Sequence, residues 1–205
     1  MTALRLVWHG LAVVGALSLA AALWLASQGV SARPTPGRFE TRVARAARHW
    51  LVPAAARHRI NLEPDTVEVL DTARAHWADH CAGCHANDGS GRTGLGQGLY
   101  PKAPDMRLPA TQALSDGELF HIIEHGVKLT GMPGWGDGTS GSERESWGLV
   151  RFIRHLPAIT EAELAEMDEL NPRSRAEWLE LEDERRFLSG TLDVPGDPHG
   201  DGHRR

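Results

Sequence analysis

The chain of 205 residues is poor in cysteine, with two, and in tyrosine, with one. It also lacks a strong charge of either sign, because its formal net charge at pH 7 is −5. A weakly negative chain is not typical of a nucleic-acid-binding protein, which needs a basic surface. Near the two cysteines there is no run of β-branched residues, so no βαβ unit is predicted there.

The two cysteines lie close together, at Cys81 and Cys84, and His85 follows them directly. A disulfide across two intervening residues would close a very tight loop. A thioredoxin-like dithiol needs a βαβ context, and a zinc site needs two further ligands at finger-like spacing, which the chain does not provide. The remaining interpretation is the attachment signature for one covalent haem c.

This spacing has a chemical reason. The two thiols add to neighbouring vinyl groups of the porphyrin, and the imidazole of His85 then reaches the iron from one face. The small residues Ala82 and Gly83 let the backbone turn close to the ring. Cys81 and Cys84 are therefore the predicted attachment residues, and His85 is the predicted proximal ligand of the iron.

The N-terminus contains a long apolar segment, from Leu6 to Ala26, without a charged side chain. As a helix it would be about 31 Å long, which matches the hydrocarbon core of a bilayer. Trp8 and Trp24 lie near its ends, as in membrane-interface belts. A signal peptide cleaved near residues 30–32 is the alternative, but signal sequences have shorter apolar regions. We therefore predict that residues 1–32 form a retained signal anchor.

Covalent attachment of haem c places the haem domain on the periplasmic side of the cytoplasmic membrane. The arginines argue the other way: only Arg5 precedes the apolar segment, whereas five arginines lie between residues 33 and 48. The positive-inside rule alone would reverse the orientation. Within the basic linker, residues 33–64, the pattern of residues 39–51 predicts an amphipathic helix. Two interpretations remain open, a solvated linker helix and a surface helix that contacts anionic lipid headgroups.

The middle of the chain resembles the class I cytochrome c family. A helix predicted over residues 65–80, with Asp65 as its N-cap, brings Ala73 and Trp77 four positions apart before the haem motif. The family usually has glycine at the position of Ala73. A closing helix is expected over residues 143–156, with Trp147, Val150 and Phe152 as its packing residues. The resemblance covers residues 65–157 and implies an all-α fold, a small cytochrome c domain wrapped around one haem.

The resemblance also implies how the loop after the motif supports the haem. Residues 86–102 contain five glycines, which would let the backbone follow one haem edge. In the family, a proline carbonyl of this loop accepts a hydrogen bond from the proximal imidazole, which fixes its tautomer. Pro101 and Pro104 are both candidates, and Pro104 is slightly favoured. Arg107 is either a partner of a haem propionate or a solvated charge.

The sixth iron ligand separates electron carriers from haems that bind or transform small molecules. Met132 lies in a Gly-Met-Pro loop that resembles the ligand loop of class I cytochromes c, after a helix expected over residues 115–127. Met106, His121 and His125 are the rivals. A thioether ligand would raise the reduction potential relative to two histidines. Trp135 is expected to cover the ring or to donate a hydrogen bond to a propionate, and core packing is the alternative.

Beyond residue 157 the resemblance ends. Residues 158–205 are expected to form an acidic tail, with a capping box at Thr160 and Glu163 and a second helix from Pro172 to about Leu188. Both helices would be solvated or would dock on a partner. The last residues contain His199 and His203, which suit weak copper, zinc or nickel binding, although a disordered tail is favoured.

The sequence thus predicts a membrane-anchored cytochrome with one haem, which passes single electrons between redox proteins. No nucleophile, base or open metal site is visible, so substrate chemistry of its own is not expected. Two alternatives remain. One is a haem sensor or peroxidase-like protein with an open sixth position. The other is a cytochrome subunit of a larger oxidoreductase complex.

Overall fold

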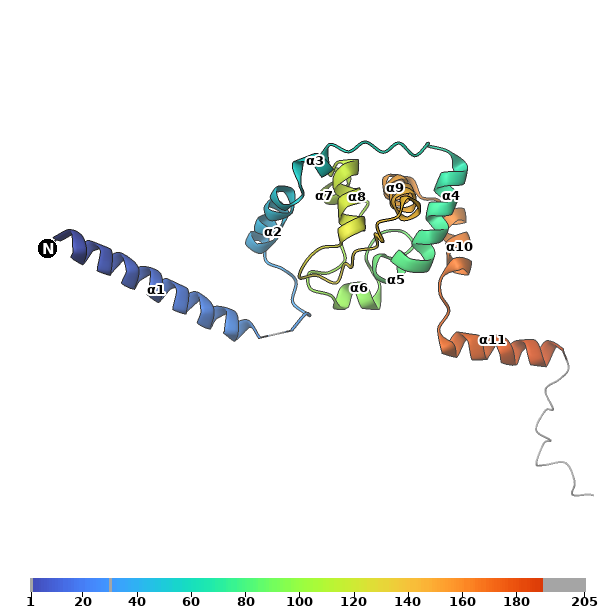
Figure 1. Ribbon diagram of the computed structural model, residues 1–205. Coiled ribbons are helices and arrows are strands. Elements are labelled where there is room, and N and C mark those ends of the chain that lie inside the picture. Colours follow the sequence, from blue (N-terminus) through green and yellow to red (C-terminus); the bar gives the residue numbers. More distant parts are fainter. Residues whose placement is uncertain (1, 30, 190–205) are drawn as a thin grey trace, which may run out of the picture.

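The computed structural model describes residues 2–29 and 31–189 (Figure 1). Within these residues it contains helices and no strand. This confirms the all-α prediction. The last sixteen residues, with His199 and His203, lie outside the described part, so the metal-binding hypothesis for the tail has no structural counterpart.

Helix α1 (Thr2–Gln28) is the N-terminal apolar helix (Figure 1). Its segment Arg5–Ser27 is long and apolar enough to cross a membrane, and none of it is buried against the rest of the protein. An N-terminal signal sequence would have the same length and composition. By length and composition, α1 therefore suits either a membrane span or a signal sequence.

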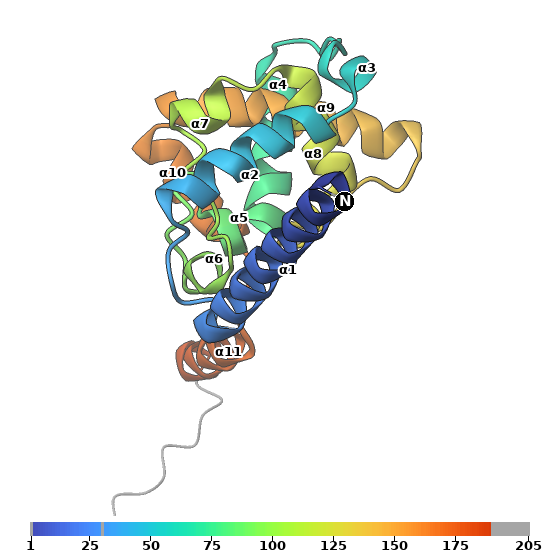
Figure 2. The ribbon, with the colours of Figure 1, turned by 90° about the vertical axis from the view of Figure 1, so that its left-hand side faces the viewer.

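Helix α2 (Arg38–Leu51) follows the linker and matches the predicted amphipathic helix, and the short α3 (Ala54–Arg57) comes next. Hydrogen bonds from side chains that the structure describes connect α2 to the domain. Arg48 Nη2 donates a hydrogen bond of 3.2 Å to the Ala110 carbonyl, and the Tyr100 hydroxyl donates one of 2.6 Å to Glu40 Oε1. Figure 2 shows α2 lying across the body of the molecule below α7.

The helix predicted over residues 65–80 consists of α4 (Val67–His76) and most of the π-helical turn η1 (Trp77–Cys81), and α5 (Ala82–His85) continues it through the haem motif. Its N-cap is Thr66 and not the predicted Asp65, because the Thr66 hydroxyl accepts a hydrogen bond from the Val69 N–H. The π-helical turn ends at the first cysteine. Single π-helical turns inside helices are frequent at functional sites.

Helix α9 (Ser140–His155) crosses α4 and forms the main packing contact of the domain. At the crossing, a Cβ on Gly148 would lie 3.6 Å from the Ala73 Cβ, an ordinary contact distance. The rings of Trp77 and Phe152 lie 5.4 Å apart, and both side chains are buried. The small residues that let the helices approach are thus Ala73 on one helix and Gly148 on the other.

Helices α6 (Gly94–Gly98), α7 (Pro109–Gln112) and α8 (Asp116–His125) connect the motif to α9. Helix α8 begins with a capping box: the Ser115 hydroxyl accepts from the Glu118 N–H, and the Glu118 carboxylate accepts from the Ser115 N–H. Phe120 of α8 stacks on Trp147 of α9, with ring centroids 4.1 Å apart. This contact fixes α8, and with it the loop that follows, against the core.

A 3-10 turn η2 (Leu156–Ala158) leads to α10 (Glu161–Leu170) and α11 (Arg175–Leu188). The Thr160–Glu163 capping box is present as predicted. The expectation that both tail helices are solvated or dock on a partner does not hold for α10. Met167 is fully buried, and Arg74 of α4 lies 2.7 Å from the Glu166 carboxylate. Helix α11 has no buried residue, and all of its residues except the half-buried Leu181 are exposed.

Candidate haem site

The two cysteines lie on the turn between η1 and α5 as free, half-buried thiols. Burial, together with the neighbouring Cys84, raises the pKa of Cys81 to about 12. A redox-active dithiol needs the opposite, a thiolate stabilised by a lowered pKa. The environment of Cys81 therefore disfavours the thioredoxin-like alternative.

His85 is nearly buried, with 8% of its surface exposed. Burial lowers its pKa to about 4, so its imidazole is neutral at pH 7 and has a lone pair for a metal ion. The ring of Trp77 lies 5.7 Å from the imidazole, and Trp77 Nε1 donates a hydrogen bond of 3.0 Å to the Ala86 carbonyl. Trp77 thus supports both the histidine and the end of the motif.

The Nδ1 atom of His85 is buried and has no hydrogen-bond partner among the described residues. A histidine on a haem iron uses one nitrogen for the metal and pairs the other with an acceptor. The bond expected to Pro101 or Pro104 is not formed here. The Pro104 carbonyl is nevertheless close to the motif: it would lie 3.1 Å from a Cβ on Gly91, whose N–H donates to the His85 carbonyl.

The glycine-rich loop packs against the motif more closely than any side chain would permit. A Cβ on Gly96 would clash with the Cys84 carbonyl, and one on Gly91 would lie 2.5 Å from the Ala103 carbonyl. The Thr93 hydroxyl donates a hydrogen bond of 2.7 Å to the Gly83 carbonyl. These contacts fit the predicted role of the loop, a backbone strap beside the haem motif.

Met132 lies half-buried in the loop between α8 and α9. Its carbonyl accepts a hydrogen bond of 3.0 Å from Val127, and its N–H donates one of 3.1 Å to the Thr130 hydroxyl. Gly126 has φ +68°, and a Cβ there would lie 2.5 Å from the Gly134 nitrogen. The first residue of the loop thus touches Gly134, and this contact closes the part of the loop that contains Met132.

The rival ligands are engaged elsewhere. Met106 packs against the hydrophobic core, and its N–H donates to the Gly89 carbonyl. His121 and His125 stack on each other on α8, with ring centroids 4.2 Å apart. Burial, followed by the charge of His125, lowers the pKa of His121. Met132 is the candidate that a dedicated loop presents.

Two further predicted contacts concern the haem edge. The ring of Trp135 lies 5.5 Å from that of His80, and Trp135 lines a cavity of about 330 Å³ that also contains His76. Arg107 pairs with Asp88 at 2.8 Å and with Asp105 at 2.7 Å. Arg107 is therefore not the solvated charge that one interpretation of the sequence predicted. Its guanidinium forms ion pairs with two carboxylates.

Sequence reasoning assigned Trp77 to the helix crossing and missed its contact with His85. The signal was present in the spacing, because residues 77 and 85 are eight apart and two helical turns bring such residues to one face. It also missed Gly148, since a lone glycine within a helical pattern does not indicate a packing role.

An all-helical domain with a Cys-x-x-Cys-His turn, a glycine strap and a Met loop defines a class I cytochrome c domain. Residues 68–153 match a family model described as cytochrome C oxidase, cbb3-type, subunit III. No curated protein matches the chain. The matched segment contains Cys81, Cys84, His85 and Met132, and a domain of this class serves haem-based electron transfer.

Proposed function

We propose that the protein is a single-electron carrier with one covalent haem c, attached through Cys81 and Cys84 and ligated by His85 and Met132. When bound, the haem supplies an iron that changes by one electron between its ferric and ferrous states. The observation that carries the proposal is the buried His85, with its unpartnered Nδ1, directly after two half-buried thiols in a matched cytochrome c segment.

The remaining residues of the site have supporting tasks in this proposal. Trp77 packs beside the His85 ring, and the Pro104 carbonyl would accept a hydrogen bond from the unpartnered Nδ1. Trp135 is proposed to cover the exposed haem edge. Met132 would supply the soft sulfur ligand that stabilises ferrous iron and would keep small ligands away from it.

The decisive experiment is an optical and magnetic circular dichroism spectrum of the oxidised protein. A near-infrared band from charge transfer between methionine and iron is expected in the wild type and in Met106→Leu, and it should vanish in Met132→Ala. If the wild type lacks this band and binds carbon monoxide readily when reduced, the protein is a sensor or a peroxidase-like protein. A denaturing gel stained for haem tests the covalent bond, which the variant Cys81→Ala/Cys84→Ala should lose.

The proposal also includes the compartment. Helix α1 would anchor the protein in the cytoplasmic membrane, with the haem domain on the periplasmic side, where haem c is attached. Protease added to intact spheroplasts should then degrade the haem domain. Protection of the domain until the cells are lysed would instead favour the orientation that the arginine distribution predicts.

A second candidate is a cytochrome subunit of a larger oxidase complex. The family description is the observation in its favour, because it names a subunit of a cytochrome c oxidase. Purification in mild detergent separates the two candidates. Copurification of a stable set of membrane proteins with haem-copper oxidase activity supports the subunit, whereas isolation of the cytochrome alone with exchangeable redox partners supports the carrier.

A further inference from the structure

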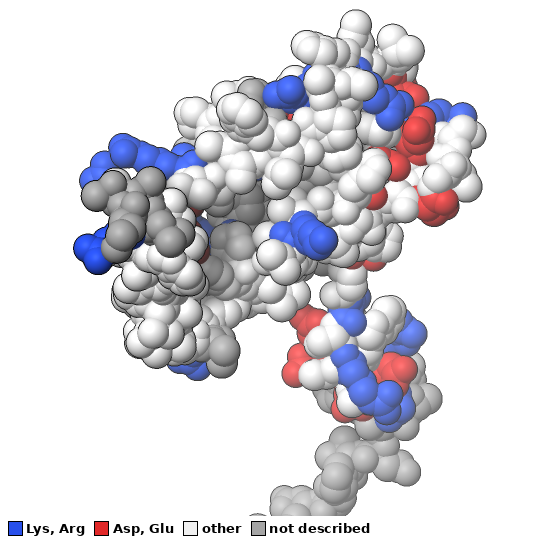
Figure 3. Space-filling model, turned by 60° about the vertical axis from the view of Figure 1, so that its left-hand side comes forward, with Lys and Arg blue, Asp and Glu red and all other residues white. Residues whose placement is uncertain are grey.

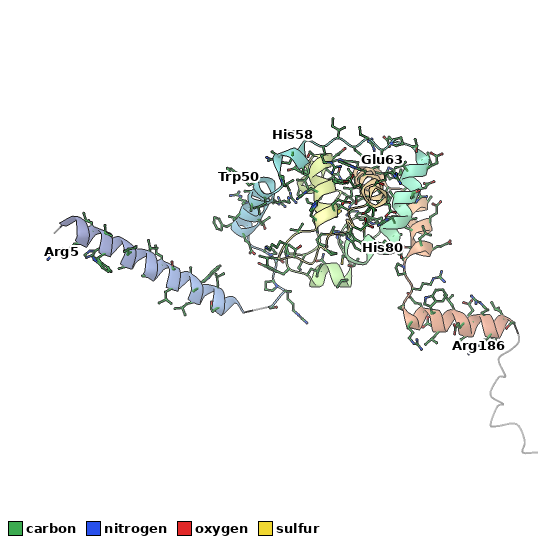
Figure 4. The ribbon with its side chains drawn as sticks, viewed as in Figure 1. Arg5, Trp50, His58, Glu63, His80 and Arg186 are labelled. Carbon is green, nitrogen blue, oxygen red and sulfur yellow. The ribbon has the colours of Figure 1, made fainter. Side chains whose placement is uncertain are left out.

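Helix α2 has a face that nothing in the described residues covers. Phe39 and Trp50 are 81% and 84% exposed, and Val43 between them is 51% exposed. At 100° per residue, these three side chains lie within about 40° of one another around the helix. Figure 4 shows Trp50 on the outer side of α2.

The flank of this face is basic. Arg38, Arg42 and Arg45 are exposed and lie on one side of the apolar face, within about 60° of one another. The whole helix contains four arginines and one glutamate. On the molecular face in Figure 3, acidic side chains gather at the right-hand edge and near α11, and the left-hand part is largely uncharged or basic.

The opposite side of the helix faces the domain. Arg48 is half-buried and donates to the Ala110 carbonyl, and burial lowers its pKa. Glu40 receives the Tyr100 hydroxyl. The helix is thus held by one side and presents the other, and the orientation of its apolar face is fixed relative to the haem domain.

The position of α2 directly after α1 in the chain indicates what covers its apolar face. Residues 29–37 join α1 to α2, and nine residues span at most about 32 Å. If α1 spans a membrane, α2 cannot move far from the bilayer surface. An amphipathic helix with aromatic residues on one face and arginines on its flank is typical of a helix in the headgroup region of an anionic membrane.

We propose that α2 lies in the headgroup region of the leaflet on the haem-domain side, with Phe39, Val43 and Trp50 toward the acyl chains. Arg38, Arg42 and Arg45 pair with anionic lipid phosphates. This inference rests on the proposed membrane anchor. Its consequence is that the haem domain has a fixed height and orientation above the bilayer, because α1 alone would leave it free to rotate on the linker.

The chain offers a matched control in α11. Both helices have 14 residues, and both expose apolar side chains. Helix α11 contains five acidic residues and three arginines, so anionic lipid should repel it. Val43 and Leu179 are equally exposed, at 51% and 49%, and each can be changed to cysteine for a nitroxide label.

The experiment uses the full, haem-loaded chain in nanodiscs of phosphatidylcholine with a quarter phosphatidylglycerol. Power saturation then compares label accessibility to oxygen, which enriches in lipid, with accessibility to a water-soluble nickel chelate. Wild type serves as the control for labelling, since thioether bonds occupy its cysteines. The ratio of oxygen accessibility to nickel accessibility should be several-fold higher for the label at Val43→Cys than for the label at Leu179→Cys. The variant Arg38→Gln/Arg42→Gln/Arg45→Gln should lower it toward the value at Leu179→Cys.

A third label at Leu17→Cys separates the two proposals. If the label at Leu17 lies deep in the bilayer while the label at Val43 lies in water, the inference on α2 is wrong and the proposed anchor stands. An aqueous label at Leu17 overturns the anchor, and the inference falls with it. If Val43 is aqueous in nanodiscs and becomes protected only when solubilised membrane proteins are added, the face binds a protein and the inference is wrong.

Discussion

The two sides of the candidate haem site are built in different ways. His85 is 8% exposed, ends the continuous helical segment formed by α4, η1 and α5, and is supported by the ring of Trp77. Met132 is half-buried in a loop closed by backbone hydrogen bonds and by the turn at Gly126. The proximal side is therefore part of the hydrophobic core, whereas the distal side depends on loop closure. The second side decides between a six-coordinate carrier and an open haem.

The largest expected difference between the two sides is in haem loading. His85→Ala should give almost no haem-loaded protein, because it removes the ligand proposed to hold the iron beside the two thiols. Met132→Ala should retain nearly normal loading, because the attachment and the proximal ligand remain. A denaturing gel stained for haem, normalised to total protein, measures both. Equal loss in the two variants would show that the proximal side has no special part in attachment.

Support of the proximal side by the core can be tested at Trp77, which is 2% exposed. Trp77→Ala should lower the free energy of unfolding by about 3–5 kcal/mol, since it leaves a large cavity beside Phe152. Trp77→Phe keeps most of the packing and loses the hydrogen bond to Ala86, worth about 1 kcal/mol. Urea unfolding of the detergent-solubilised protein, followed by haem absorbance, gives both values. Similar losses in the two variants would contradict a packing role.

On the distal side, the test is Gly126→Ala. Its φ of +68° is unfavourable for alanine, and the new Cβ would meet the Gly134 nitrogen at 2.5 Å. We expect a loss of about 1–3 kcal/mol and a weaker near-infrared band, because Met132 is no longer held.

The matched control is Gly148→Ala at the helix crossing, where the nearest atom would be 3.6 Å away. Its stability should change by no more than about 1 kcal/mol, since alanine favours the helix. A band that stays intact in Gly126→Ala would mean that loop closure does not position the methionine.

Features that depend on residues close together in the sequence could be predicted, and features that depend on distant residues could not. The haem motif, the helix before it and the capping box at Thr160 depend on residues within a few positions of one another, so they could be predicted from the sequence. The partnership of Ala73 with Gly148 and the wall that Trp77 forms beside His85 depend on how the helices cross, which no local pattern specifies.

Helix α10 shows the same limit most clearly. Its sequence is rich in carboxylates and predicts a solvated helix. In the structure, the apolar Met167 inserts into the core, and the carboxylates beside it meet Arg74 of α4. A charged helix can pack one face on the domain when a distant segment supplies the complementary charge, and such a partner is invisible until the fold is known.

This contact yields the smallest predicted effect, which again concerns the proximal side because α4 leads into the motif. Glu163 caps α10, lies 3.5 Å from Arg74 and lies 2.7 Å from His155. Burial raises the pKa of Glu163, but hydrogen bonds from Thr160 and His155 outweigh this, so the pKa lies below its ordinary value of 4.5. The folded state thus prefers the ionised carboxylate. This stabilisation is complete above the ordinary pKa and is lost as the pH falls through the lower folded-state pKa.

Glu163→Gln should therefore cost about 1 kcal/mol at pH 7, and the difference from wild type should shrink as the pH falls below about 4.5. Urea unfolding at a series of pH values from neutral to acid measures this difference. Glu161→Gln is the control, because Glu161 is exposed in the same first turn and neither caps the helix nor pairs with Arg74. A constant difference across this pH range would mean that Glu163 acts by packing alone. The helix that covers α4 would then owe its position to Met167 and not to its carboxylates.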